Sequence, residues 1–337
     1  MADIKRLLFL LVILLSFYLL YKLVVRRQQI FADYEAESTD KIEPFVDVIP
    51  RISPCKNMKF PLKEYAIMSS WNSATNESLQ MSLDALDKVL ARGYRFIDLE
   101  IYSIDNKPNV GFSTQKNNDT MESTPLLFLD VCQRIILTGF STNNGQDPLF
   151  LHLRIKSASP VIFEKLADIC LHECKSRLYE GKVTKNTVLS DLQGKLVIIV
   201  DRNYYPQSET YKCIDSCKND FTSIINMYSG TPEFESMPFV QKLEQPTTPL
   251  MKTNGGLTNV DKLRMVIHNM GSLNVENNGP EFYTLLKNYS IQIFPQKVYY
   301  RDDNLNVYEE FFVNNGHRAF VPMSIAFSFI NNETELD

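Results

Sequence analysis

Apolar residues along most of the chain form either short continuous runs, typical of buried strands, or stripes with a helical period. The first strand-like run is 65–70, and the stretch 78–91 carries leucines and a valine at the i, i+3, i+4 spacing of a helix. Gly93 follows this stripe as a helix-ending residue before the next apolar run. The pattern therefore predicts a strand followed by a helix as the repeating unit.

Counting such runs predicts eight strands. They cover residues 65–70, 96–102, 109–113, 149–155, 195–201, 223–228, 264–269 and 291–299. Further helices are predicted at 126–137 and 161–178, and nearly every strand is followed by a helical or long connection. This order predicts an α/β protein with a (β/α)8 TIM barrel, distorted in places, rather than an open sheet. In such a barrel the active site forms at the carboxyl ends of the strands.

The N-terminal segment has a different pattern. Leu7 to Val25 is apolar except for Ser16, two tyrosines and Lys22, and as a helix it would span about 28 Å, close to the thickness of a hydrocarbon core. No small-x-small cleavage site precedes Arg26-Arg27, which favours an uncleaved single-pass transmembrane helix over a secretory signal peptide. The slight excess of positive charge after the helix places the body of the protein on the cytosolic side.

These patterns divide the chain into four predicted parts. They are a transmembrane anchor over 1–27, an extended stalk over 28–59, a barrel over 60–327 and a C-terminal tail over 328–337. The stalk is predicted because its residues are mostly polar, include three prolines and show neither a helical nor a strand period.

Length, hydrophobic content and net charge limit which class of protein the chain can belong to. With 337 residues and 44% hydrophobic residues, the chain can bury a sizeable core. Its formal net charge is -5, and no long basic run occurs outside the N-terminus, which excludes nucleic acid as the main partner.

Two Cys-x3-Cys pairs occur among the six cysteines, Cys170 with Cys174 and Cys213 with Cys217. On helices each pair would share one face, so two such helices could be joined by disulfides or could hold zinc. Buried free thiols are the third alternative and the favoured one, because zinc sites more often use closer spacing.

Candidate chemistry gathers where the first two runs end. Ser69-Ser70-Trp71-Asn72 closes the first run and contains the single tryptophan of the chain. In the second run, Asp98 and Glu100 lie two residues apart and therefore on one face of an extended strand. Three oxygen ligands could converge there, which is a possible metal site.

Several stretches resemble phosphoinositide-specific phospholipase C. Residues 65–74, Tyr-Ala-Ile-Met-Ser-Ser-Trp-Asn-Ser-Ala, are similar to the Ser-Ser-His-Asn-Thr-Tyr motif that opens its catalytic barrel. Residues 92–100, Arg-Gly-Tyr-Arg-Phe-Ile-Asp-Leu-Glu, are similar to its Arg-Gly-Cys-Arg-Cys-Val-Glu-Leu-Asp. Weaker similarities follow in the same order at 127–132, 194–197, 295–298 and 314–321, so the resemblance spans about residues 60–325.

The resemblance implies a phosphodiesterase with two catalytic histidines and a calcium ion held by an asparagine and three carboxylates. The first histidine falls on Trp71 and the second near Phe112, and neither side chain moves a proton. The metal asparagine is kept as Asn72, and the two strand carboxylates are kept as Asp98 and Glu100 with their lengths exchanged.

The fourth ligand of the family falls on Arg154. A guanidinium is always protonated, so it would pair with Asp98 or Glu100 and stand in for the calcium ion. The family's substrate-binding lysines are replaced in Val200-Asp201-Arg202, where Arg202 is the one cation. The resemblance therefore implies a degenerate member with no bound calcium and no other cofactor.

Three functions follow. The first is a membrane-anchored, catalytically inactive barrel, a pseudoenzyme that acts as a structural or interaction protein with protein partners. The second is an active phosphodiesterase, cleaving phosphoinositides or glycerophosphodiesters with displaced histidines at His152 or His268. The third is a binder of lipid headgroups that uses Arg154, Arg202 and Arg264 without cleavage.

The amino-acid composition suggests where a protein with the first function would act. The chain is rich in Asn, Ile and Tyr and lacks the accessory domains of the family, a combination that resembles proteins of large DNA viruses. There, an anchored inert barrel could link the inner membrane of the virion to capsid proteins. A cellular membrane protein is the alternative.

Overall fold

The computed structural model describes residues 52–56, 58–113, 123–157, 159–202, 219–238, 252–253, 256–257, 262–267 and 282–333, together with Tyr18 and Lys22. The chain divides into two units, Met1–Val48 and Ile49–Asp337, and the fold below is that of the second. The predicted anchor, Leu7 to Val25, lies outside the described residues apart from Tyr18 and Lys22. Within the described part of the chain, no helix combines the length and apolar character needed to cross a membrane.

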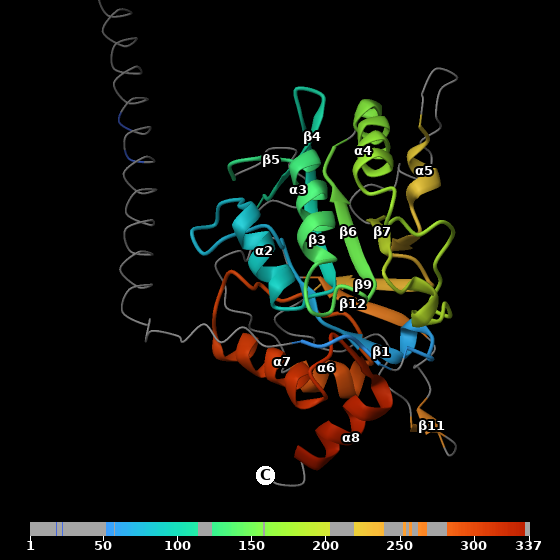
Figure 1. Ribbon diagram of the computed structural model, residues 1–337. Helices are drawn as coiled ribbons and strands as arrows, with labels where there is room; N and C mark the ends of the chain where they lie inside the picture. Colours follow the sequence, from blue (N-terminus) through green and yellow to red (C-terminus); the bar gives the residue numbers. More distant parts are fainter. Residues whose placement is uncertain are drawn as a thin grey trace, which may run out of the picture. The chain divides into compact units, whose positions relative to one another are not determined.

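A seven-stranded sheet is the largest element of the fold (Figure 1). Its order is β5 (Leu126–Leu127), β4 (Lys107–Gly111), β3 (Phe96–Ile104), β6 (Leu149–Ile155), β7 (Leu196–Asp201) and β8 (Met227–Ser229), and β2 (Ser69–Ser70) also pairs with β3. The pairs β2–β3, β3–β6, β6–β7 and β7–β8 are parallel, whereas β4 is antiparallel to both β3 and β5. The parallel strands bring their carboxyl ends to one edge of the sheet.

Smaller pairings complete the set of strands. Strand β1 (Tyr65–Ile67) is antiparallel to β13 (Phe320–Pro322), β9 (Phe234–Pro238) is parallel to β12 (Leu263–Ile267), and β10 (Lys252–Thr253) is antiparallel to β11 (Gly256–Leu257). Single parallel bridges join Ile293 to Ile67 and to Met265, and join Gln296 to Ser70. Among the described residues β8 and β9 are not paired, so strand pairing does not close into a barrel there.

The α/β class predicted from the sequence is confirmed, and seven of the eight predicted strands overlap a strand of the structure. The predicted strand 223–228 overlaps only at Met227 and Tyr228, because Ser223 and Ile224 belong to α5. The predicted strand 109–113 is β4, which turns back on β3 because Asp105 and Asn106 adopt left-handed backbone angles, with φ of 51° and 56°. The predicted strand 291–299 forms only the isolated bridges at Ile293 and Gln296. Strand β9 was not predicted.

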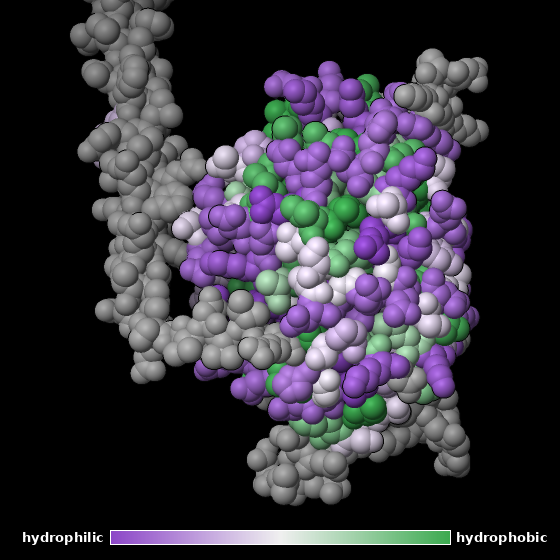
Figure 2. Space-filling view, viewed as in Figure 1, coloured by the Kyte–Doolittle hydropathy of each residue, from purple (hydrophilic) through white to green (hydrophobic). Residues whose placement is uncertain are grey.

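The helices lie on the outside of the strands. They are η1 (Leu62–Glu64), α2 (Leu83–Ala91), α3 (Phe128–Arg134) with its π-helical continuation η2 (Ile135–Gly139), α4 (Pro160–Glu173), η3 (Leu189–Leu192), α5 (Phe221–Ile224), α6 (Phe282–Tyr289), α7 (Asp303–Asn314) and α8 (Met323–Glu333). Figure 1 shows α2, α3 and α4 over the sheet and α6, α7 and α8 grouped at the other end, near β1. The visible surface is a mosaic of hydrophilic residues with small apolar patches (Figure 2).

Helix α2 shows how local sequence sets an element. It begins later than the predicted residue 78 because the Ser82 hydroxyl accepts a hydrogen bond from the Ala85 amide, at 3.4 Å, and caps the helix. Gly93 follows the helix with a φ of 93°, and a Cβ there would lie 2.5 Å from Cβ of Ile52. Only glycine satisfies both conditions.

The folded unit extends beyond the predicted barrel at both ends. Ile52, Cys55 and Met58 belong to the predicted stalk 28–59, yet all three are buried in the hydrophobic core. Ile330 of α8 lies in the predicted tail 328–337 and is also buried in the core. Pro54 therefore lies in an irregular segment, beginning at Ile52 among the described residues, that packs on the domain.

Three thiols lie together between α3 and α4. Cys132, Cys170 and Cys174 are fully buried free cysteines. Burial, followed by hydrogen bonding to the other two thiols, raises the pKa of Cys132. Cys213 and Cys217 lie outside the described residues, so the predicted alternatives stay open for that pair.

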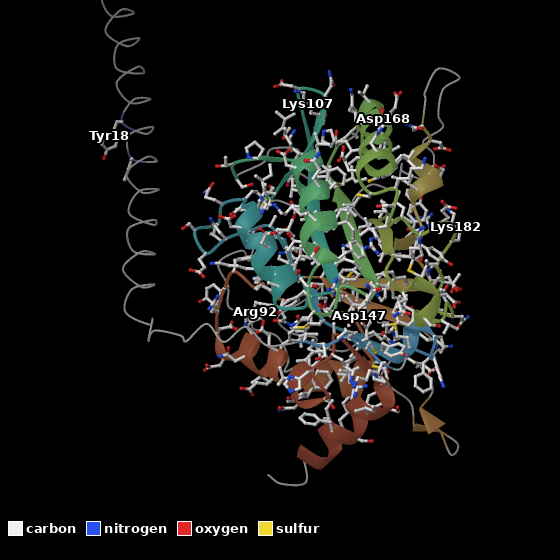
Figure 3. All side chains as sticks on the ribbon, viewed as in Figure 1. Tyr18, Arg92, Lys107, Asp147, Asp168 and Lys182 are labelled. Atoms are coloured by element: carbon white, nitrogen blue, oxygen red, sulfur yellow. The ribbon has the colours of Figure 1, made fainter. Side chains whose placement is uncertain are left out.

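Asp147 ties the segment around Cys55 to the sheet. Its Oδ1 accepts a hydrogen bond from the Cys55 amide at 2.9 Å, and its side chain is fully buried. Asp147 is labelled in Figure 3. Burial raises the pKa of Asp147 to about 6, against the opposing effects of the Cys55 amide and Arg95. The folded state therefore binds a proton here more tightly than the unfolded chain, in which an aspartate has a pKa of about 3.9.

Asp147→Asn is expected to change the pH dependence of stability. Between pH 4 and pH 6 the wild-type carboxyl loses its proton at a free-energy penalty to the folded state, whereas the amide has no proton to lose. The free energy of unfolding of the variant, relative to wild type, should rise by about 2–3 kcal/mol from pH 4 to pH 7. Urea denaturation at both pH values measures this, with Asp191→Asn at an exposed position as the control. An Asp147→Asn difference that stays constant with pH contradicts the prediction.

Candidate functional site

Arg154 lies at the centre of a buried polar cluster formed by side chains of the neighbouring strands β3 and β6 and of Asn72. Its Nε donates to Asp98 Oδ1 at 2.9 Å. Its Nη2 donates to Asp98 Oδ2 and to Asn72 Oδ1, both at 2.6 Å, and its Nη1 donates to Glu100 Oε1. One guanidinium thus contacts all three oxygen-bearing side chains that the sequence places at the possible metal site.

The strand register brings these side chains together. In the parallel pair β3–β6, Asp98 lies opposite His152 and Glu100 lies opposite Arg154. Alternate residues of a strand share a face, so all four side chains project to the same side. Asn72 follows β2 with a left-handed φ of 42°, which asparagine tolerates. The backbone N–H of Asn72 donates a hydrogen bond to Asp98 Oδ2 at 3.1 Å.

Aromatic rings occupy both positions that the resemblance gives to histidines. The Trp71 ring stacks on the guanidinium, with Cζ of Arg154 3.6 Å from the ring centroid. Such cation–π contacts are strongest when both groups are desolvated, and Trp71 is only 2% exposed. Phe112 is also buried, and its amide donates to Ser123 Oγ at 3.1 Å. Neither ring can accept or donate the proton that phosphodiester cleavage requires.

Both carboxylate oxygens of Glu100 accept hydrogen bonds from protein donors. Besides Arg154, its Oε2 accepts from the Tyr102 hydroxyl at 2.6 Å and from the Ser113 amide at 3.1 Å. Burial, followed by the charge of Glu100, raises the pKa of Tyr102, so the phenol stays a hydrogen-bond donor.

His152 is held inside the same network. Its Nδ1 lies 2.7 Å from Asp98 Oδ1, its Nε2 lies 2.9 Å from Ser229 Oγ, and Asp201 Oδ2 is 3.7 Å from Nε2. An ionised carboxylate only accepts hydrogen bonds, so Nδ1 carries a proton and donates it to Asp98. This order of Ser229, His152 and Asp98 resembles a hydrolytic triad, but His152 and Ser229 are 0% exposed.

The charge state of the cluster follows from Asp98. Burial alone raises the pKa of Asp98, but Arg154 and His152 outweigh burial and hold the pKa well below its usual range. The carboxylate is therefore ionised at every physiological pH. The cluster is a buried ion-pair network, with Arg154 paired to two carboxylates.

The other cations predicted to contact headgroups lie in different surroundings. Arg264, on β12, pairs with Glu235 at 3.0 Å and donates to the Tyr289 carbonyl at 2.9 Å. Arg202 directly follows β7 and is half-buried. His268 lies outside the described residues.

Sequence reasoning missed three members of the network, Tyr102, Ser113 and Ser229. Tyr102 had a signal, because it follows Asp98 and Glu100 by the same two-residue step and therefore shares their face. Ser113 acts through its backbone amide, and Ser229 comes from a strand far along the chain. Neither contact leaves a local signal in the sequence.

The residues present do not fit a calcium ion. Calcium takes six to eight oxygen ligands at about 2.3–2.6 Å. Here the space between the oxygens of Asn72, Asp98 and Glu100 holds the guanidinium of Arg154, which hydrogen-bonds to each of them. Among the residues that the structure describes, no group of three or more His, Cys, Asp or Glu side chains is placed to hold a metal.

Comparison with known proteins agrees with this geometry at the level of the fold. Residues 58–202 match the family described as phosphatidylinositol-specific phospholipase C, X domain. The crystal structure of L. pealei PLC21 is similar with a TM-score of 0.59 and 17% identity, over 81% of this chain and 38% of that one. The S. officinalis PLC21 structure gives a TM-score of 0.58 and 17% identity over the same shares. This chain thus spans well under half of either protein, and no curated protein sequence matches it.

Proposed function

We propose that this chain, which belongs to the phospholipase C-like superfamily through the X-domain match at residues 58–202, is a catalytically inactive member that serves as a structural or interaction module. The observation that carries the proposal is the guanidinium of Arg154 among Asn72, Asp98 and Glu100. In the related enzymes, as the resemblance implies, these positions bind the catalytic cation. Here the cation is a side chain that coordinates no substrate.

The chemistry of phosphoryl transfer supports this proposal. Catalysis of this reaction depends on positioned charge and on groups that move protons. Trp71 and Phe112 stand where the resemblance places the two histidines, and Trp71 covers the guanidinium. A substrate phosphate would have to displace the indole ring and then compete with two carboxylates for Arg154.

The two alternative functions have less support. Displaced catalysis by His152 needs a ring that substrate can reach, yet both ring nitrogens are engaged and the residue is 0% exposed. Headgroup binding by Arg154 and Arg264 needs free donors, yet each already serves carboxylate oxygens.

The setting of the module is part of the proposal. We infer from Leu7 to Val25 that a single-pass helix holds the domain at a membrane. A domain with no reaction of its own then acts through protein partners, for which the resemblance to large DNA viruses suggests capsid proteins. The order of strands and helices leads us to propose a distorted (β/α)8 barrel as the complete fold.

The full-length chain in detergent is expected to show no hydrolysis of phosphatidylinositol or phosphatidylinositol bisphosphate, with or without calcium. Release of water-soluble inositol phosphate from labelled lipid measures this, with an active phosphatidylinositol-specific phospholipase C as positive control. The reason is that the guanidinium of Arg154 fills the space among Asn72, Asp98 and Glu100, and that neither Trp71 nor Phe112 can move a proton.

A Trp71→His/Phe112→His variant is the matched comparison and should also remain inactive while Arg154 is present. Turnover by the unmodified chain contradicts the proposal. His152→Ala and His268→Ala would then show whether displaced histidines carry that activity.

A further inference from the structure

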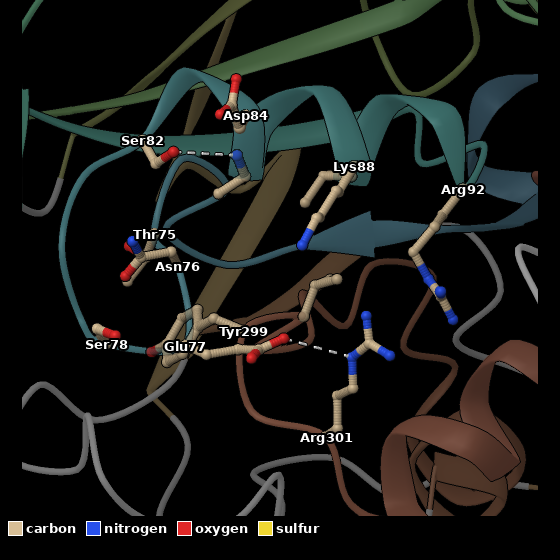
Figure 4. A pocket seen from close by; sticks show the side chains of 13 residues that line it. Thr75, Asn76, Glu77, Ser78, Ser82, Asp84, Lys88, Arg92, Tyr299 and Arg301 are labelled. Carbon is tan, nitrogen blue, oxygen red and sulfur yellow. Dashed lines mark hydrogen bonds and ion pairs between the residues drawn. The ribbon is translucent and has the colours of Figure 1, made fainter. Parts of the chain in front are cut away.

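The described residues form a pocket of about 250 Å³ beside α2, but its charges are balanced within the protein (Figure 4). Its lining includes three cations and two carboxylates, Lys88, Arg92, Arg301, Asp84 and Glu77. Glu77 approaches Arg301 at 3.8 Å, and Glu309 accepts a hydrogen bond from Nε of Arg92 at 2.7 Å. The chemistry that the proposed function does not use lies elsewhere, among the buried thiols of the domain.

Three buried thiols meet between α3 and α4, which lie side by side (Figure 1). Cys132 comes from α3, whereas Cys170 and Cys174 come from the C-terminal end of α4. The Cys174 amide donates to the Cys170 carbonyl at 3.0 Å, so these two residues are one helical turn apart and share a face of α4. All three cysteines are 0% exposed, and the Cys132 thiol is hydrogen-bonded to both of the others.

A disulfide in this cluster would join the two helices. Thiols in hydrogen-bond contact need only small side-chain rotations to reach the S–S length of about 2.0 Å. Side chains one turn apart on a helix have Cβ atoms about 5–6 Å apart, whereas a disulfide holds its Cβ atoms at about 3.5–4.5 Å. A bond between Cys170 and Cys174 would therefore distort α4, and Cys132 is the partner that each of them already contacts.

We infer that this cluster is an oxidation site, in which Cys132 forms a disulfide with Cys170 or with Cys174 and links α3 to α4 covalently. A peroxide is the class of oxidant that the reaction takes. One thiol sulfur attacks a peroxide oxygen, the O–O bond breaks, and the products are a sulfenic acid and one water. A second thiol then attacks the sulfenic sulfur, the S–S bond forms, the S–O bond breaks and a second water leaves. Two thiols thus lose two electrons and two protons to the peroxide, and the third thiol stays reduced.

Burial limits how fast this reaction runs. It is the largest cause of the raised pKa of Cys132, so the reactive thiolate is scarce at neutral pH. Peroxide reaches the sulfurs when α3 and α4 separate locally, and the disulfide then opposes further separation. The bond closes a loop of about 40 residues that contains all of β6, and closing such a loop stabilises a fold mainly by restricting the unfolded chain. The link forms whether or not the chain catalyses a reaction.

Mass spectrometry locates the bond directly. The full-length chain in detergent is incubated with excess hydrogen peroxide, alkylated at its free thiols and digested with trypsin without reduction. Trypsin leaves Cys132 on the peptide 117–134 and both α4 cysteines on the peptide 166–175. These two peptides should be found joined, with one alkylated cysteine remaining on 166–175. Recovery of both peptides without a link between them overturns the inference.

The midpoint of thermal unfolding supplies a second readout. Peroxide should raise the midpoint of wild type by about 5–10 °C, and dithiothreitol should reverse this rise. Dithiothreitol reduces a disulfide but does not reverse methionine oxidation, so the reversible part of the shift belongs to the disulfide. A midpoint of the peroxide-treated chain that dithiothreitol leaves unchanged overturns the inference.

Alanine variants assign the bond to its cysteines. Cys132→Ala and the double variant Cys170→Ala/Cys174→Ala should lose both the joined peptides and the reversible shift, whereas either single variant on α4 should keep them. Cys55→Ala is the matched control, because Cys55 is also buried and free but its thiol donates to the Phe320 carbonyl at 3.8 Å. Cys55→Ala should respond like wild type. A reversible shift that survives in Cys132→Ala, or one that disappears in Cys55→Ala, overturns the assignment.

Discussion

Arg154→Met is expected to lower the free energy of unfolding by about 3–5 kcal/mol, because the variant leaves Asp98 and Glu100 buried without their countercharge. Methionine fills much of the same volume, so the loss is electrostatic rather than a packing defect. Folded domains are stable by only about 5–15 kcal/mol, so this loss removes a large share of the total. The midpoint of thermal unfolding should fall by about 6–15 °C.

Arg134→Met is the matched control. Arg134 also pairs with a carboxylate, Asp87, but the two side chains are 33% and 29% exposed. Water screens that pair, so its loss should cost about 1 kcal/mol or less. If Arg154→Met and Arg134→Met lower the free energy of unfolding by the same small amount, the charge of Arg154 does not stabilise the buried cluster.

The second large effect concerns calcium. Arg154→Glu returns a carboxylate to the position where the resemblance places the fourth calcium ligand, beside Asn72, Asp98 and Glu100. Without a cation three buried carboxylates repel one another, and the variant should be less stable than Arg154→Met. Calcium should reverse the loss, since a ligand that binds only the folded state stabilises it.

Thermal unfolding of Arg154→Glu with 5 mM calcium, 5 mM magnesium or a chelator measures this rescue. Calcium should raise the midpoint by about 5 °C or more, and magnesium should raise it less because magnesium demands a stricter octahedral geometry. Arg134→Glu makes the same charge change at the surface and should show no calcium response. If calcium does not raise the unfolding midpoint of Arg154→Glu, the guanidinium of Arg154 does not lie where a calcium ion would bind.

Much of the fold was predictable from the sequence because its signals are local. The apolar run of β6 and the stripe of α2 each carry a period that fixes the type of element. The two-residue spacing of Asp98 and Glu100 fixed their common face, and the resemblance placed Arg154 near them. These are properties of single segments or of one ordered set of motifs.

The remainder depends on partners that are distant in sequence. Periodicity gives no strand direction, so β4 was predicted as a barrel strand although it pairs antiparallel with β3. The segment 291–299 is apolar like a strand, but it pairs only at Ile293 and Gln296. Whether Asp98, Glu100 and Arg154 form a closed network was equally open, because it depends on the register between β3 and β6.

The guanidinium of Arg154 lies among the oxygens of Asn72, Asp98 and Glu100, where the resemblance places a calcium ion. Equilibrium dialysis of the full-length chain against radioactive calcium tests this most directly, with wild type and Arg154→Glu measured side by side. We expect no calcium bound to wild type above the level of Arg134→Glu, and one calcium ion per chain on Arg154→Glu. One calcium ion bound per wild-type chain, with Arg154 in place, would contradict this expectation.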